Sequence, residues 1–309
     1  MICDNFDDIY EIVSQARKYT KDGKVADYIP ALGEADPNNL AVAMFDGNGT
    51  CLSAGNVEET FTLQSVSKVL SLALALLDNG AEKVFTRVGM EPTGDPFNSI
   101  AKLESLKPSK PLNPMINAGA LAVTNMIAGA GTEDKLGRLL EFIHDLTGNT
   151  SITYNEKVAT SEFETADLNR ALCYFMRQHG GIDGGVEELM DLYTKQCAIE
   201  MDCEDLSKIG YVLANEGVDP VSQREIIPLH IARIVKTFMV TCGMYNASGE
   251  FAIRVGIPAK SGVSGGILGA VPHKLGIGIY GPALDEKGNS IAGMKLLETL
   301  SSRFDLSMF

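Results

Sequence analysis

The spacing of apolar and polar positions differs between the two ends of the chain and its middle. Residues 6–20 alternate at helical spacing, which predicts an amphipathic helix. The apolar run 40–45 predicts a strand, and the turn signal 46–49 with the return segment 50–53 predicts a β-hairpin. Near the other end, strands are predicted over 251–257, 266–271 and 275–280, followed by a final helix over 290–303.

The middle of the chain is predicted to be mostly helical. The segment 65–79 is long, apolar and rich in Leu and Ala, and Asn79-Gly80 closes it, which predicts a buried helix that ends at a glycine. Residues 80–114 are rich in Gly, Pro and Lys and are predicted to be irregular. Further helices are predicted over 115–128, 133–147, 166–179, 186–198, 204–215 and 228–242.

Strands at both ends with helices between them favour an α+β fold, because short hairpin connections build an antiparallel sheet. We expect both chain ends to join in one sheet and the helical middle to pack beside it. The expected division is a single domain over 1–309, with a sheet-containing part over 1–64 and 243–309 and a mainly helical part over 65–242.

Composition and charge exclude several classes of partner. Apolar residues make up 45% of the 309 residues and charged residues 21%, as in ordinary globular domains. The formal net charge of −14 argues against nucleic acid and anionic membranes as partners, since both attract positive charge. The sequence has neither an apolar run of about 18 residues nor a basic leader followed by an apolar stretch, so we expect a cytoplasmic protein.

The cysteines and histidines show no ligand spacing. None of the cysteines forms a C-x-x-C pair and the four histidines lie far apart, so we expect free thiols, no metal and no cofactor. The six cysteines are Cys3, Cys51, Cys173, Cys197, Cys203 and Cys242.

The tetrad Ser65-Val66-Ser67-Lys68 has the S-x-x-K pattern at the start of an apolar helix. Positions i and i+3 share a helix face, so the lysine amine can reach the serine hydroxyl. Lysine can activate that hydroxyl only if burial lowers its pKa well below about 10.4, and the apolar segment 69–74 offers such burial. The helix N-terminus suits an oxyanion. Taken alone, the pattern also fits an ordinary helix start with a solvated lysine.

A second element, Lys260-Ser261-Gly262, follows the strand predicted to end at Ile257. In serine acyl-enzymes of the penicillin-binding and β-lactamase type, a similar Lys-Thr-Gly tripeptide lies on a strand beside the nucleophile. The tripeptide supplies a hydroxyl and a nearby backbone amide. Together the two elements predict a serine acyl-enzyme.

Five segments make the chain resemble the serine-dependent glutaminases, the family of bacterial glutaminases and of the catalytic domain of animal mitochondrial ones. The segments are 23–30, 63–68, 113–120, 242–245 and 258–263. The resemblance implies a fold like that of serine β-lactamases and penicillin-binding proteins, and the hydrolysis of L-glutamine to L-glutamate and ammonia. It implies Ser65 as nucleophile, Lys68 as general base, and a homodimer or homotetramer.

The resemblance also implies a substrate site. Its residues fall at Tyr28, Gln64, Ser65, Asn117, Glu162, Asn169, Tyr193, Tyr245 and Val263. Glu162, rather than the neighbouring Glu164, stands seven residues before Asn169 as the family pattern requires. The loop 93–98 is expected to gate the site, as its family counterpart does.

The chemistry of these residue types fits free glutamine, which carries an ammonium and a carboxylate. Glu162 can pair with the ammonium, while Asn117, Asn169 and a tyrosine hydroxyl can bind the carboxylate. The backbone N–H groups of Ser65 and Val263 are expected to form an oxyanion hole. A hydroxyl must relay a proton to the leaving ammonia, and Tyr245 is the first candidate, with Ser261 the second.

Two other motifs are not interpreted as functional. Residues 262–266 match G-x-S-x-G, but a nucleophile elbow needs a following helix and a strand is predicted instead. Residues 276–281 match G-x-G-x-x-G, but Pro282 follows where a dinucleotide site needs a helix, so a strand of small residues is predicted. Two alternative functions remain: an S-x-x-K hydrolase of β-lactams or D-Ala peptides, and a silent protein that binds glutamine in the same pocket.

Overall fold

The computed structural model describes residues 6–49, 51–94, 98–105 and 110–309. Its helices are α1 Phe6–Arg17, α2 Ser67–Arg87, α3 Ile100–Ser105, α4 Asn117–Asn125, α5 Thr132–Thr147, α6 Glu156–Thr165, α7 Asp167–Gln178, α8 Val186–Cys197, α9 Cys203–Ala214, α10 Leu229–Cys242, α11 Ser248–Arg254 and α12 Ile291–Phe304. Its strands are β1 Ala41–Phe45, β2 Cys51–Gly55, β3 Phe61–Thr62, β4 Glu200–Met201, β5 Ala259–Ser261, β6 Gly266–Val271 and β7 Leu275–Tyr280.

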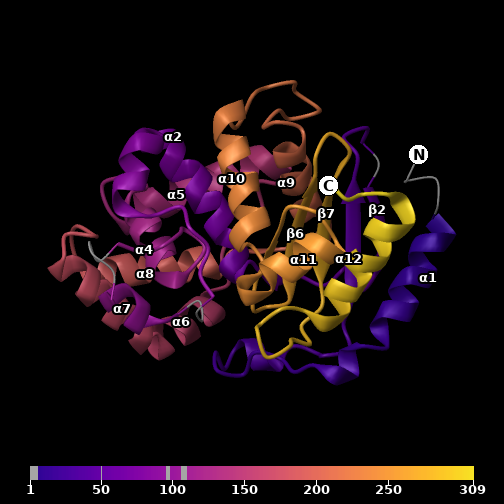
Figure 1. Cartoon of the computed structure of the whole chain (residues 1–309), viewed down its shortest axis with the longest axis horizontal. Coiled ribbons are helices and arrows are strands. Elements are labelled where there is room, and N and C mark those ends of the chain that lie inside the picture. Colours follow the sequence, from indigo (N-terminus) through magenta and orange to yellow (C-terminus); the bar gives the residue numbers. More distant parts are fainter. Residues whose placement is uncertain (1–5, 50, 95–97, 106–109) are drawn as a thin grey trace.

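The centre of the fold is a five-stranded antiparallel sheet in the order β2-β1-β7-β6-β5. Side chains of β1 alternate between two buried faces, with Val42 packing toward α1 and α12, and Ala43 packing in the core that α9 and α2 share. Helices α1 and α12 lie beyond the sheet at the right of Figure 1, and α9 lies on its other side. This confirms the predicted β-lactamase-like α+β class, with a sheet drawn from both chain ends.

The helices of the middle segment pack beside the sheet. At the left of Figure 1, helices α4 and α5 pack against α2, and α7 and α8 pack against α4. The 3₁₀ turn Gln64–Val66, which leads into α2, contacts β5, β6 and α8. The turn that carries Ser65 is therefore held between the sheet and the helices. The expected boundaries between the two parts stay a prediction. In the part of the chain that the structure describes, no helix is long and apolar enough to cross a membrane.

The predicted strand over 251–257 is wrong. Its first residues form α11, and the strand begins later, at β5. The alternation of Phe251, Ile253 and Val255 resembles a strand, yet Ile253 is 89% exposed while Phe251 and Val255, four residues apart, are both buried. That spacing is the buried face of a helix. The sequence Lys260-Ser261 consequently lies on β5 itself rather than after a strand.

The predicted glycine stop at Gly80 is only partly correct. Gly80 has non-helical angles, φ 76° and ψ 157°, but helical structure resumes and α2 ends at Arg87, with Val84 buried in the core. The prediction that 80–114 is irregular is thus wrong for 81–87 and for α3. Helix α6 and strand β4 were not predicted. Residues 95–97 of the expected gate lie outside the described residues.

The G-x-G-x-x-G pattern lies in β7, as the strand prediction required, and its glycines bring a helix close to the sheet. A Cβ added to Gly276 would lie 2.0 Å from the Ser207 carbonyl oxygen, and one on Gly278 would lie 2.1 Å from that of Cys203. Both carbonyls belong to α9, so the absence of side chains lets the helix backbone rest directly on the strand. The motif therefore serves packing.

Replacing Gly278 with alanine tests this packing. Gly278→Ala should lower the free energy of unfolding by about 1–3 kcal/mol, because strand and helix must separate to admit the methyl group. Urea denaturation followed by circular dichroism measures the change. The control is Gly137→Ala in α5, where an added Cβ meets nothing within 4 Å, so stability should stay the same or rise by up to about 1 kcal/mol. Equal stability of Gly278→Ala and the native protein would contradict the close-packing account.

Candidate active site

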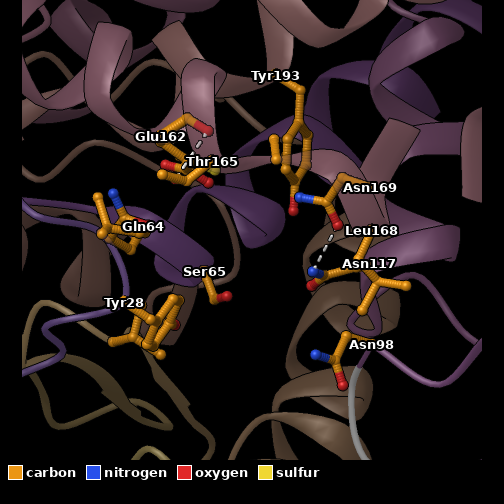
Figure 2. A pocket seen from close by; sticks show the side chains of 14 residues that line it. Tyr28, Gln64, Ser65, Asn98, Asn117, Glu162, Thr165, Leu168, Asn169 and Tyr193 are labelled. Atoms are coloured by element: carbon orange, nitrogen blue, oxygen red, sulfur yellow. Dashed lines mark hydrogen bonds between the residues drawn. The ribbon is translucent and has the colours of Figure 1, made fainter. Parts of the chain in front are cut away.

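A cleft of about 260 Å³ lies in front of Ser65. It brings together eight of the nine predicted substrate residues: Tyr28, Gln64, Ser65, Asn117, Glu162, Asn169, Tyr193 and Val263. Figure 2 shows Tyr28, Gln64 and Glu162 on one side of Ser65, and Asn117, Asn169 and Tyr193 on the other. The ninth, Tyr245, lines a smaller neighbouring cavity, and Lys68 and Ser261 lie buried behind the cleft.

Buried hydrogen bonds fix the turn that presents Ser65. Gln64 has a left-handed backbone with φ 46°, a conformation that L-residues rarely adopt. The Ser67 hydroxyl donates to the Gln64 carbonyl oxygen at 2.7 Å, and the Gln196 amide of α8 donates to the hydroxyls of Ser67 and Ser71, each at 3.2 Å. These buried hydrogen bonds hold the strained turn in place, so Ser65 stays directed toward the cleft.

The amine of Lys68 is buried, with 1% of the residue exposed. Its Nζ donates to the Met115 carbonyl oxygen at 3.2 Å and to Asn117 Oδ1 at 2.7 Å. Burial lowers the pKa of Lys68 to about 8, although the negative charge of Glu162 acts against this shift. A lysine with this pKa has a far larger neutral fraction near pH 7 than an exposed lysine, and only the neutral amine can accept a proton.

Two asparagine amides form the opposite wall. Asn117 begins α4, and its Nδ2 donates to Oδ1 of Asn169 on α7 at 2.9 Å. Because Lys68 donates to Asn117 Oδ1, the orientation of both amides is determined by the amine. Amide hydrogens remain on Asn117 and Asn169 for a further acceptor. This wall is suited to an anionic group.

Glu162 of α6 is a buried acid on the other side of the cleft. The residue is 7% exposed, and its Oε2 has no hydrogen-bond partner among the described residues. Burial raises the pKa of Glu162 to about 7, while the Gln64 amide and the charge of Lys68 act against this shift. A buried carboxyl oxygen without a partner is costly unless a ligand supplies a donor. Glu162 is therefore suited to a cationic group.

The hydroxyl oxygens of Tyr245 and Ser261 are both buried. Burial raises the pKa of Tyr245, and the Ser65 hydroxyl acts in the opposite direction. The Ser261 hydroxyl, on β5, has no hydrogen-bond partner within the described ranges. Both hydroxyls are thus candidates for a proton relay, and Ser65 influences that of Tyr245.

The loop after β5 brings Val263 to Ser65. Gly262 allows this approach, because a Cβ there would lie 2.6 Å from the Leu63 carbonyl oxygen, immediately before the Ser65 turn. The Gly262 N–H donates to the Gly266 carbonyl at 2.9 Å, and the Gly265 N–H donates to the Gly262 carbonyl at 2.9 Å. These bonds fix a tight turn, which explains why a glycine-rich motif that is not a nucleophile elbow lies beside the serine.

Sequence reasoning missed some residues of the site. Cys197 lines the cleft, and burial raises its pKa well above the ordinary value, so it is a neutral thiol. Its position four residues after Tyr193 on α8 was a usable signal, since i and i+4 share a helix face. Gln196 carried no such signal, because its partners Ser67 and Ser71 are more than a hundred residues away.

Comparison with known proteins points to one family. The family model described as glutaminase matches residues 23–309. The chain is 68% identical over 299 residues to a protein named glutaminase 1 from Halalkalibacterium halodurans, covering 97% of each chain. It is 67% identical over 309 residues to a glutaminase from Shouchella clausii, covering the whole of both.

Solved structures agree with this. A probable glutaminase from Bacillus subtilis complexed with 6-diazo-5-oxo-L-norleucine has a TM-score of 0.90 at 40% identity, over 98% of this chain and 96% of that one. The covalent complex of the Bacillus subtilis glutaminase YbgJ with 5-oxo-L-norleucine also has a TM-score of 0.90 at 40% identity, over 98% and 99%. With a family match from residue 23 to the end and relatives 67–68% identical over nearly their whole length, this chain belongs to the glutaminase family.

Proposed function

We propose that this glutaminase hydrolyses the side-chain amide of L-glutamine through an acyl-enzyme on Ser65, with Lys68 as general base. The observation that carries the proposal is the buried Lys68 amine, whose pKa is lowered to about 8, one helical turn from a serine at a cleft. Ser65 Oγ attacks the amide carbon while Lys68 takes its proton. Ammonia leaves, and water then hydrolyses the ester to release L-glutamate.

The cleft walls match the two charges of the free amino acid. Glu162 faces the ammonium, because its Oε2 lacks a partner among the described residues. Asn117 and Asn169 face the carboxylate with their remaining amide hydrogens, and Tyr193 adds a hydroxyl at the same wall. Tyr28 and Gln64 line the opposite side. A substrate held at both α-groups must have the glutamine length to bring its amide to Ser65.

Charge that develops during the reaction has two protein partners. The N–H groups of Ser65 and Val263 bind the oxyanion, which the close approach of the 262–265 turn supports. The Tyr245 hydroxyl relays a proton to the leaving ammonia, a role supported by its burial and by the effect of Ser65 on its pKa. Ser261 is the second candidate for this relay.

The cellular location and the assembly of the protein belong to the same proposal. A cytoplasmic location is supported by the free buried thiols of Cys173, Cys197, Cys203 and Cys242, which suit a reducing compartment. A homodimer or homotetramer is proposed from membership of the glutaminase family. Sedimentation of the purified protein would test the assembly.

Ammonia release from L-glutamine tests the reaction and the nucleophile together. The native protein should turn over glutamine, and Ser65→Ala should lose about 10⁴-fold or more of kcat/KM, the order of loss expected when a catalytic serine is removed. Ser301→Ala is the matched control, since this hydroxyl is also buried but lies in α12, away from the cleft. It should keep native activity.

The same assay includes L-asparagine and a chromogenic β-lactam. L-Asparagine is one methylene shorter and should be a poor substrate, and the lactam should not be turned over. A folded native protein that binds glutamine without turnover would support the silent-binder alternative. Hydrolysis of the lactam instead of glutamine would support the alternative of an S-x-x-K hydrolase of β-lactams or D-Ala peptides. Either result would overturn the proposal.

Replacing Glu162 tests the ammonium site. Glu162→Gln should raise KM for glutamine about 100-fold, equivalent to about 3 kcal/mol, because a buried charge pair is lost. The kcat value should change much less. Glu164→Gln, two residues along the same helix but exposed, is the control and should leave KM unchanged. An unchanged KM in Glu162→Gln would place the ammonium elsewhere.

The pH dependence follows from two pKa values. Rising pH deprotonates Glu162 through about 7, which allows it to pair with the ammonium, and Lys68 through about 8, which frees the base. Both changes favour the reaction, so kcat/KM should rise from about pH 6 to about pH 9. In Glu162→Gln the step near 7 should vanish, and the Lys68 step should move below 8 because the carboxylate no longer raises that pKa. Initial-rate profiles measure both, and an unshifted profile in the variant would contradict the assignment.

A further inference from the structure

Lys260, the first residue of the Lys-Ser-Gly element, has no part in the mechanism above. It is fully buried in β5 and is not among the residues that line the Ser65 cleft. Its Nζ donates to the Gly243 carbonyl oxygen at 3.1 Å and to the Ser261 carbonyl oxygen. The same Nζ lies 4.3 Å from the centre of the Tyr245 ring. A buried amine in contact with the expected proton relay calls for a physical explanation.

The acceptors around Lys260 account for all the hydrogens of an ammonium group. Lysine has three donors when charged, and here two carbonyl oxygens and the negative face of an aromatic ring are within reach. None of these three contacts is with a carboxylate. Burial and the nearby Lys68 lower the pKa of Lys260, while the two carbonyl oxygens and the aromatic ring favour its protonated form. Its contacts therefore concern the Tyr245 segment rather than the substrate.

The Tyr245 segment is one that needs support. Tyr245 has a left-handed backbone with φ 51°, a conformation that costs on the order of 1–3 kcal/mol and persists only when the surroundings enforce it. One brace is Ser248, whose hydroxyl accepts from the Met244 N–H at 3.0 Å and donates to the Tyr245 carbonyl at 2.9 Å. That brace fixes the backbone. Lys260 contacts the ring itself, which also packs against the apolar side chains of Val263 and Leu284.

We propose that Lys260 is a positioning residue that holds the Tyr245 ring so that its hydroxyl meets Ser65 and the leaving ammonia. This inference rests on the proposed function, because it assumes that Tyr245 relays the proton. The Lys260 amine joins β5 to the turn at Gly243 and contacts the Tyr245 ring. The hydroxyl at the far end of that ring is the group on which Ser65 acts. Lys260 touches neither substrate nor the reacting atoms.

A double-mutant cycle tests the proposal, with Lys260→Met, Tyr245→Phe and the double variant assayed on L-glutamine. Methionine keeps the volume of the side chain and removes every donor. Lys260→Met should lower kcat about 10–100-fold, part of the contribution of a proton relay, while KM stays within about twofold. In the Tyr245→Phe background the same replacement should lower kcat by less than about twofold, because residues that act as a unit are not additive.

A second substrate adds a readout that a general loss of packing would not move. L-Glutamic acid γ-monohydroxamate has a small leaving group, hydroxylamine, which is a weaker base than ammonia and depends less on a proton relay. Lys260→Met and Tyr245→Phe should both lose less kcat on the hydroxamate than on glutamine. Lys135→Met, which removes a partly buried lysine far from the cleft that donates to the Asn125 carbonyl, is the matched control and should leave both rates unchanged.

The outcomes distinguish the proton relay by Tyr245 from the positioning role of Lys260. Native kcat in Tyr245→Phe would overturn the relay itself, and with it this part of the proposed function. An impaired Tyr245→Phe, combined with an equal loss from Lys260→Met in both backgrounds and on both substrates, would overturn only the positioning role. Should Lys260→Met fail to fold, Lys260→Gln, whose amide keeps a donor for Gly243, enters the same cycle with the same criteria.

Discussion

The burial of the Lys68 amine is the constraint on which the rest of the site depends. A lysine can serve as a base near neutral pH only if burial lowers its pKa by more than nearby negative charges, here that of Glu162, raise it. The hydrogen-bond partners of the amine are two neutral acceptors, the Met115 carbonyl oxygen and the Asn117 amide oxygen. Because Asn117 Oδ1 is committed to the amine, the amide hydrogens of Asn117 are left for Asn169 and for a substrate carboxylate. One buried charge thus determines both the base and one wall of the cleft.

This arrangement requires both halves of the fold. The helices supply Asn117, Glu162 and Asn169, while the sheet side supplies the 262–265 turn and the Tyr245 segment. The Ser65 turn lies between the two groups and contacts β5, β6 and α8. Two residues with a left-handed backbone, Gln64 and Tyr245, lie at this junction, where hydrogen bonds can enforce that conformation. Packing away from the site, such as the close contact of α9 with the glycines of β7, contributes stability that offsets the cost of this strain and of the buried amine.

Sequence alone predicted the features that local spacing determines. The relation of Ser65 to Lys68 follows from helical geometry, and the small-residue strand 275–280 follows from Pro282 after a glycine pattern. Local spacing could not decide between the period of a strand and that of a helix over the short segment 251–257. The structure decides it, because Phe251 and Val255 are buried and Ile253 between them is exposed. Nor could it reveal the support from Gln196, because only tertiary packing brings α8 under the Ser65 turn. The nine substrate positions came from family resemblance, and their roles stay a proposal.

The most direct test of the central claim is a titration of Lys68 itself. Protein labelled with ¹³C at the lysine ε-carbon gives a resonance for Lys68 that is assigned by its absence in Lys68→Met. The account predicts that its chemical shift titrates with a pKa of about 8 in the unliganded protein. A titration near the ordinary lysine value of about 10.4 would show a charged amine at neutral pH and would contradict the claim that Lys68 is the base.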